Sequence, residues 1–190
     1  METYEAIVKR RSIRRFKIAK VSMDVLKKCV NAARLAPSAA NLQPLHYIII
    51  TDNNLVKKIF SFIKWAGYLK WSPTVDEGPP AYILVIRDKR ITGEGKYVKY
   101  DAGFAIENIV LTALSEGLGT CILAAFDQKK IRVLLNIPLE YDIELLIALG
   151  YANEQSRVTE MTTSIQYYRT GKILHVPKRR LEEIVHIDTF

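Results

Sequence analysis

The chain has 190 residues, of which 49% are hydrophobic and 25% charged, and a formal net charge of +8 at pH 7. This length suits one domain, which can bury about 70% of the surface that its unfolded form exposes and needs no metal or disulfide for stability. The composition is that of a soluble globular protein without a long apolar run, and the charged N-terminal residues 1–20 lack the apolar centre of a signal peptide. We therefore expect a cytoplasmic protein with a single domain over residues 1–190, and no membrane partner.

The first half of the chain alternates helical and extended patterns. We predict helices over residues 3–10, 23–36 and 55–64, and strands over the buried segment 47–51 and over 81–87. Ser22 can cap the second helix. The segment PSAANLQP, residues 37–44, is rich in small and amide side chains, so its backbone could approach a ligand closely. Residues 65–80 are irregular, and they form either a pocket wall or lid, or aromatic packing under a surface loop.

The second half contains one strong helical pattern over residues 101–117, with Asp101 near its start and glycines after its end. Apart from Glu107 and one polar stripe, this helix is apolar almost all round. Such a helix needs burial on several sides, which suggests that a second subunit also packs against it.

The remaining segments complete the prediction of one α+β domain. We expect an exposed turn at residues 88–96, interior strands at 120–125 and 143–150, a helix over 128–136, and a short charged helix from Pro177 to Val185. Residues 154–171 are polar and fit no element.

The cysteines and histidines offer no metal site. Cys29 and Cys121 lie in apolar patterns, so we interpret them as small buried hydrophobic residues rather than a redox pair. The three histidines have no metal-like spacing with one another or with the cysteines. We assign no metal ligand.

Positive charge gathers near both ends of the chain. Residues 9–20 hold seven basic residues and no acid, including the run RRSIRRF at 10–16, and a second basic group occupies residues 178–180. A basic run is by itself more typical of solvated surface or a nonspecific nucleic-acid patch. However, arginine forks match phosphate oxygens, so the two groups could clamp one anionic ligand. Because no known nucleic-acid-binding motif is present, we expect no nucleic-acid partner.

The chain resembles the FMN-dependent nitroreductase family through six segments that occur in the family's order: RRSIRRF, PSAANLQP, DAGFAIENIVLTALSEGLGTC, ILAAFD, ALGYA and PKRRLEEIV. The resemblance covers nearly the whole length and is weakest over residues 65–99 and 153–176. It implies a nitroreductase-like α+β fold with a mixed, mainly antiparallel sheet flanked by helices. It also implies an interlocked homodimer with FMN at the subunit interface, in which residues 101–117 form the long interface helix.

The resemblance also implies which residues bind FMN. Those that would grip the phosphate and ribityl chain are Arg10, Arg11 and Ser12, with Lys178 and Arg180 at the C-terminus. Arg14 would lie nearer the pyrimidine edge, where its charge would favour the reduced, anionic flavin. Those that would reach the flavin ring from the other subunit are Pro37, Ser38, Ala39, Asn41 and Gln43. Ala124 and Ala125 would place their backbone beside N5, although family members often have glycine at the position of Ala124. We expect Arg15, Lys17, Lys20 and Arg179 to be solvated.

The implied activity is that of an oxidoreductase whose hydride chemistry belongs to the flavin. In a ping-pong cycle, NADH or NADPH would reduce FMN and leave, and a nitroaromatic, a quinone or a similar electrophile would then be reduced. This cycle needs no acid–base side chain, and the sequence shows no such constellation, so we name no catalytic residue. The alternatives are dehalogenation or flavin fragmentation as in related members, a flavin-binding protein for storage or sensing without turnover, and a basic nucleic-acid binder without flavin.

Overall fold

The main sheet of the protein has four strands, in a computed structural model that describes residues 1–65, 67–93 and 95–190. Their spatial order is β1 (Leu45–Ile50), β2 (Ala81–Asp88), β4 (Tyr141–Gly150) and β3 (Gly119–Leu123), and each neighbouring pair is antiparallel. Ser12 adds a parallel bridge to Thr120 on the outer side of β3. The predicted α+β class with a mixed, mainly antiparallel sheet is confirmed.

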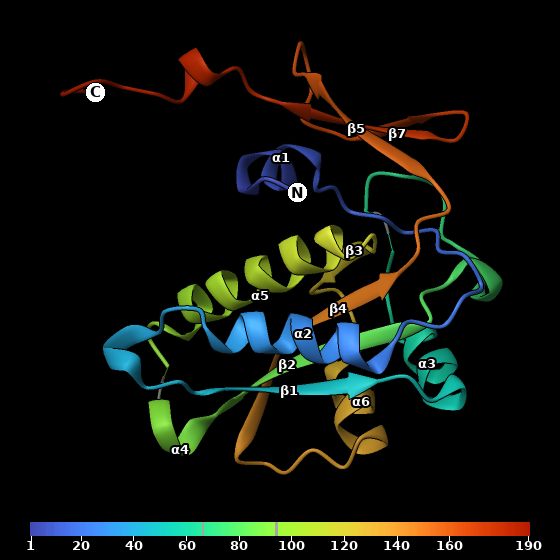
Figure 1. The fold of residues 1–190 in the computed structure, drawn as a ribbon, viewed down its shortest axis with the longest axis vertical. Helices are drawn as coiled ribbons and strands as arrows, with labels where there is room; N and C mark the ends of the chain where they lie inside the picture. Colours follow the sequence, from blue (N-terminus) through green and yellow to red (C-terminus); the bar gives the residue numbers. More distant parts are fainter. Residues whose placement is uncertain (66, 94) are drawn as a thin grey trace.

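Helices cover both faces of this sheet, because successive side chains of a strand point to opposite faces. Ile83 and Val85 of β2 face one core, which contains α2 (Met23–Arg34) and α5 (Val98–Ser115). Tyr82 and Leu84 face the other core, which contains α3 (Asn53–Phe60), α6 (Gln128–Leu134) and part of the N-terminal segment. Figure 1 shows α2 and α5 side by side across the sheet.

The helices predicted from periodicity and capping are present with small shifts of their ends. Ser22 caps α2 by accepting a hydrogen bond from the backbone N–H of Asp24. After α5, Gly117 adopts the left-handed φ of 78° that lets the chain turn into β3. Cys29 and Cys121 are buried and unpaired, and burial raises the pKa of each thiol to about 11.

A second, three-stranded sheet lies above the N-terminal helix α1 (Thr3–Lys9) in Figure 1. Its order is β5 (Gln155–Glu160), β7 (Ile173–Lys178) and β6 (Tyr168–Thr170), with β5 and β7 parallel. The polar segment that fitted no element therefore supplies two strands. The predicted helix up to Val185 is wrong, because only the 3₁₀ turn η3 (Leu181–Glu183) forms and the tail then extends away from the body.

Two strands differ from the prediction. β3, predicted to be interior, ends the four-stranded order, and β1, predicted to be buried, has only Ile50 fully buried in this chain. Their apolar side chains misled the prediction, because an edge strand that still has one covered face carries a similar pattern.

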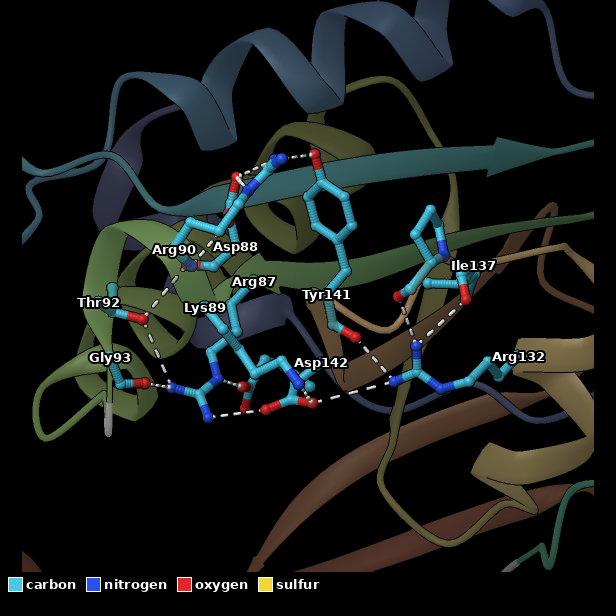
Figure 2. A network of polar contacts seen from close by, with 12 residues as sticks. Arg87, Asp88, Lys89, Arg90, Thr92, Gly93, Arg132, Ile137, Tyr141 and Asp142 are labelled. Carbon is cyan, nitrogen blue, oxygen red and sulfur yellow. Dashed lines mark hydrogen bonds and ion pairs between the residues drawn. The ribbon is translucent and has the colours of Figure 1, made fainter.

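A network of charged side chains fixes α4 (Lys89–Thr92) against the sheet (Figure 2), where we had predicted an exposed turn. The buried carboxylate of Asp88 accepts hydrogen bonds from Arg90 Nε at 2.9 Å and Nη2 at 2.6 Å. Arg87 donates to Asp142 at 2.8 Å, and Arg132 donates to main-chain carbonyls around the start of β4. Because every charged side chain of the network has an oppositely charged or carbonyl partner within it, we interpret it as structural. Of the predicted turn, Glu94 lies outside the described residues.

Within the described ranges, no helix is both long and apolar enough to cross a membrane. The same residues contain no group of three or more histidine, cysteine, aspartate or glutamate side chains that could hold a metal ion.

Candidate functional site

The basic run is built into the fold as an extended segment between β3 and the chain that follows β4. Ile13 donates its backbone N–H to the Thr120 carbonyl at 2.8 Å. On the other side, Lys17 donates to the Tyr151 carbonyl at 2.8 Å, and Asn153 donates to the Arg15 carbonyl at 2.9 Å. The backbone of the predicted cofactor segment is therefore fixed on both sides.

Arg15 is not solvated as expected. Its Nε lies 3.1 Å from Glu77 Oε1, and its guanidinium carbon lies 4.5 Å from the centre of the Trp71 ring. The guanidinium of Arg169 lies 4.9 Å from the same ring. Trp71 is thus in contact with two arginines that come from distant parts of the chain, and such cation–π contacts become stronger when they are partly desolvated.

Trp71 belongs to residues 65–80, which we expect to form either a pocket wall or lid, or aromatic packing under a surface loop. Trp65 is 8% exposed and packs in the core against Phe60, with ring centres 5.4 Å apart. Tyr68 remains exposed and meets the Tyr167 ring edge to face at 5.0 Å. The aromatic residues of the described part of the segment therefore pack against the fold, with Tyr68 left accessible, whereas its residues 75–80 form a wall of a cavity of about 440 Å³.

Three arginines of the basic run have a buried nitrogen atom that lacks a hydrogen-bond partner in the part of the chain that the structure describes. They are Arg11 Nε, Arg14 Nη1 and Arg15 Nε, and of these Arg15 Nε lies within ion-pair distance of Glu77. Burial and the neighbouring charge of Arg10 lower the pKa of Arg11. The guanidinium of Arg14 lies over the Tyr167 ring at 4.8 Å, and Arg10 Nε lies 3.5 Å from Glu107 Oε1. Buried guanidinium donors without acceptors are costly by themselves and fit an anionic ligand.

The loop of residues 37–43 holds an unusual backbone. Ala40, Asn41 and Gln43 have φ values of 49°, 53° and 51°, a left-handed conformation that non-glycine residues rarely adopt. Two hydrogen bonds hold it: Asp101 Oδ1 accepts the N–H of Ala39 at 3.0 Å, and Ser38 Oγ accepts the N–H of Gln43 at 3.0 Å. Strained backbone of this kind clusters at ligand sites.

Asp101 is the residue of this loop site that the sequence did not reveal. The sequence places Asp101 only near the start of a helix, but the structure shows it buried in the first turn of α5, where it lines a cavity of about 140 Å³ under the loop. Of the predicted loop residues, Ser38 and Ala39 are half-buried, whereas Pro37, Asn41 and Gln43 are exposed.

Ala124 and Ala125 are exposed just after β3 and lie outside the strand predicted to contain them. Ala125 accepts a hydrogen bond from the backbone N–H of Lys64 at 2.9 Å. Both alanines line a cavity of about 550 Å³ together with Phe62 and Lys130. Their backbone is thus open to a ligand on one side.

The C-terminal basic pair, Lys178 and Arg180, has no contact partner in common with the basic run among the described residues. Lys178 is exposed at the end of β7, and Arg180 forms an ion pair with Glu160. Within the described ranges, neither side chain shares a hydrogen bond or ion-pair partner with Arg10 or Arg11. The two halves of the predicted clamp are therefore not joined by any side-chain contact of this single chain.

One face of α5 and neighbouring surfaces expose large apolar side chains. Tyr100 is 64% and Phe104 is 52% exposed on α5, and Tyr4 is exposed on α1. The extended tail carries exposed apolar residues as well, among them Ile187 and Phe190. Exposed apolar side chains that lie together on one face are typical of interaction sites.

Residues 7–151 match the model of the Nitroreductase family. A "Putative NADH dehydrogenase/NAD(P)H nitroreductase" from Archaeoglobus fulgidus is 31% identical over 162 residues, which cover 81% of this chain and 87% of the relative. An iodotyrosine deiodinase from Thermotoga neapolitana is 25% identical over 170 residues, which cover 80% and 89%. The solved structure of an FMN-dependent nitroreductase from Clostridium difficile R20291 superposes with a TM-score of 0.72 at 26% identity, covering 97% of this chain and 98% of that one.

These matches define the class of protein. The family model spans more than half of the chain, and the archaeal relative is similar over most of its length. The chain belongs to the nitroreductase family, as the order of its motifs indicated.

Proposed function

We propose that this protein is an FMN-dependent oxidoreductase that takes electrons from NADH or NADPH and passes them to a nitroaromatic, a quinone or a similar electrophile. Family membership supports an oxidoreductase, and the names of similar proteins support both FMN and a reduced pyridine nucleotide. The observation in the structure that carries the proposal is the pair of buried arginine nitrogens, Arg11 Nε and Arg14 Nη1, that have no acceptor in the described part of the chain.

The residues of the basic run fit a phosphate-bearing cofactor. Arg10, Arg11 and Ser12 would bind the phosphate and ribityl chain, because Arg11 has a buried donor without an acceptor in the described residues and the backbone of the run is fixed. Arg14 would face the pyrimidine edge of the flavin. The hydride chemistry of the reaction would be supplied by FMN held at this site. The chain itself supplies binding, orientation and positive charge.

The remaining predicted contacts complete the cofactor site in this proposal. The loop residues Pro37, Ser38, Ala39, Asn41 and Gln43 reach the flavin from a second subunit, and Ala124 and Ala125 present backbone to its ring. Lys178 and Arg180 bind the phosphate once Arg180 exchanges Glu160 for it.

The protein forms a homodimer in this proposal. The exposed side chains of Tyr100 and Phe104 lie on α5, the helix whose nearly continuous apolar pattern predicts burial on several sides. A second copy covers this face and brings its own loop to the cofactor. The cytoplasmic location and the single domain over residues 1–190 stay predictions.

Reductive dehalogenation of an aromatic substrate is a second candidate, favoured by the similarity to an iodotyrosine deiodinase. Both reactions use the same reduced cofactor and differ in the acceptor, so the same assay separates them.

The test is a comparison of acceptors on FMN-loaded protein. NADH and NADPH oxidation is followed with a nitroaromatic, a quinone and an iodinated phenol in turn, under argon. We expect turnover that depends on both the nucleotide and the nitroaromatic or quinone. Turnover only with the iodinated phenol, with iodide released, supports the second candidate. Absence of turnover with every acceptor contradicts an enzymatic role and leaves flavin storage or sensing.

A further inference from the structure

A buried glutamate holds the backbone of the basic run. Glu154 follows β4, and its side chain is 0% exposed. Its Oε1 accepts the backbone N–H of Arg14 at 2.5 Å and that of Arg15 at 3.2 Å. Its Oε2 accepts a hydrogen bond from Arg169 Nη2 on β6 at 2.6 Å. One carboxylate thus joins the basic run to the second sheet.

The charge of Glu154 matters for the arrangement. Two backbone N–H groups and one guanidinium satisfy a carboxylate that burial would otherwise strongly destabilise. Arg14 donates the shorter of the two backbone hydrogen bonds. Its side-chain atom Nη1 is buried and lacks a partner in the described ranges. Because the N–H groups of Arg14 and Arg15 belong to the two peptide groups that flank the Arg14 Cα, holding both of them restrains the direction of its Cα–Cβ bond.

The side chains around Glu154 restrict motion further. Arg169 stacks on Trp71, and Trp71 also contacts Arg15, which pairs with Glu77. Arg15 therefore has its charge matched and its side chain turned into this cluster. Arg14, one residue earlier, keeps an unmatched buried donor.

We propose that Glu154 is a positioning residue for cofactor binding: by accepting the N–H groups of Arg14 and Arg15, it turns the Arg14 guanidinium toward the ligand and leaves Arg15 in the fold. This inference rests on the proposed FMN site. It assigns a functional role to residues outside the basic motif, in the region of the chain where the family resemblance is weakest. Arg169 pairs with the buried carboxylate of Glu154 and so offsets its charge.

If the Glu154–Arg169 pair has a purely structural role, any variant that breaks the pair is less stable. All folded variants that lack the pair then bind FMN with the same affinity, whatever residue replaces Glu154. The two roles are separated by variants that all lack Arg169 and differ only in the acceptor offered to the two N–H groups.

The experiment compares three proteins: Arg169→Met, which keeps the carboxylate; Glu154→Gln/Arg169→Met, which keeps a neutral acceptor oxygen; and Glu154→Met/Arg169→Met, which has none. The dissociation constant for FMN is measured by quenching of flavin fluorescence, well below the melting temperature of each apoprotein. The reduction potential of the bound flavin is measured at saturating FMN. Glu144→Met is the matched control, because Glu144 is a largely buried carboxylate 3.1 Å from Arg87 Nε.

We expect the dissociation constant to rise along the series, by at least about tenfold between Arg169→Met and Glu154→Met/Arg169→Met, since hydrogen bonds to a charged acceptor are involved. The glutamine variant should lie between them. The potential should fall in the same order, because Arg14 loses its direction, and Glu144→Met should change neither quantity.

Equal FMN affinities and potentials across the three Arg169→Met proteins overturn the inference. If the variant without an acceptor does not fold, the glutamine variant still decides, since it should bind FMN at least about threefold more weakly than Arg169→Met. Failure of the wild-type protein to bind FMN refutes the proposed function instead, so the two failures are distinguishable.

Discussion

Substitution of Arg11 can distinguish a role in stability from a role in ligand binding, because the two roles predict opposite changes in melting temperature and FMN affinity. Its guanidinium is partly buried beside Arg10, and its Nε has no hydrogen-bond partner among the described residues. Burial lowers the pKa of Arg11, which means that the folded apoprotein disfavours its charged form. The charge nevertheless remains at neutral pH, because the ordinary pKa of arginine is far higher. We therefore predict that Arg11→Met leaves the melting temperature of the apoprotein unchanged or raises it.

The same substitution should weaken FMN binding strongly. A hydrogen bond to a charged group contributes about 1.5–3 kcal/mol, so loss of one such bond to the phosphate corresponds to roughly 10- to 150-fold in the dissociation constant. The effect is electrostatic, so it should decrease as the salt concentration rises. Affinity and stability are thus expected to move in opposite directions.

The assay combines thermal denaturation of the apoprotein with titration of FMN by fluorescence quenching. Arg157→Met is the control, because Arg157 is an exposed arginine on β5. It should change FMN affinity by less than about twofold, since surface charges away from the ligand contribute little. If Arg11→Met lowers the melting temperature and leaves FMN affinity intact, Arg11 is a structural residue and the reasoning is refuted.

Three further predictions concern other parts of the molecule. Phe104→Glu places a charge on the exposed apolar face of α5 and should convert a dimer to a monomer in sedimentation; an unchanged mass contradicts the proposed interface. Asp101→Ala removes the acceptor of the Ala39 N–H, so the affinity for FMN should fall at least about fivefold. The far-ultraviolet circular dichroism spectrum should stay that of the folded protein, and an unaltered FMN affinity excludes a role for this hydrogen bond. The hydrogen bond from Arg90 lowers the pKa of Asp88 to about 2, so its stabilising contribution is present above the unfolded pKa of about 4 and is lost as the pH falls toward 2. In Asp88→Asn, the urea concentration at the midpoint of unfolding should therefore depend less on pH over this range than in the wild type. An equal pH dependence in the two proteins would exclude this contribution of Asp88.

The sequence was a good guide wherever the signal is local. The cap at Ser22 and the apolar stripe after it define α2, and the nearly continuous apolar pattern of residues 101–117 defines most of α5. Local propensity also placed β2, which is buried along most of its length. These elements depend on residues within one or two turns of one another, and so they can be recognised without knowledge of the fold.

The errors arose where structure depends on distant partners. The parallel pairing of β5 with β7 joins polar segments that have no clear alternation, so neither segment is recognisable as a strand alone. The expectation that Arg15 is solvated was wrong, because Glu77, Trp71 and Arg169, which surround it, come from distant parts of the chain. Glu154 carried no signal because its role depends on two backbone N–H groups about 140 positions away.

The candidate site was therefore predicted in its motifs and not in its supporting contacts. The basic run could be identified because arginine and serine donors at this density match a phosphate, and because the order of the motifs defines the family. Asp101, which supports the loop of residues 37–43, looked like an ordinary helix-start acid.

The most direct test of the account is the visible spectrum of the purified protein under argon before and after addition of NADH or NADPH. We expect a yellow protein with bound, extractable FMN whose absorption bleaches when nucleotide is added and returns when a nitroaromatic or quinone follows. A colourless protein that cannot be reconstituted with FMN contradicts it.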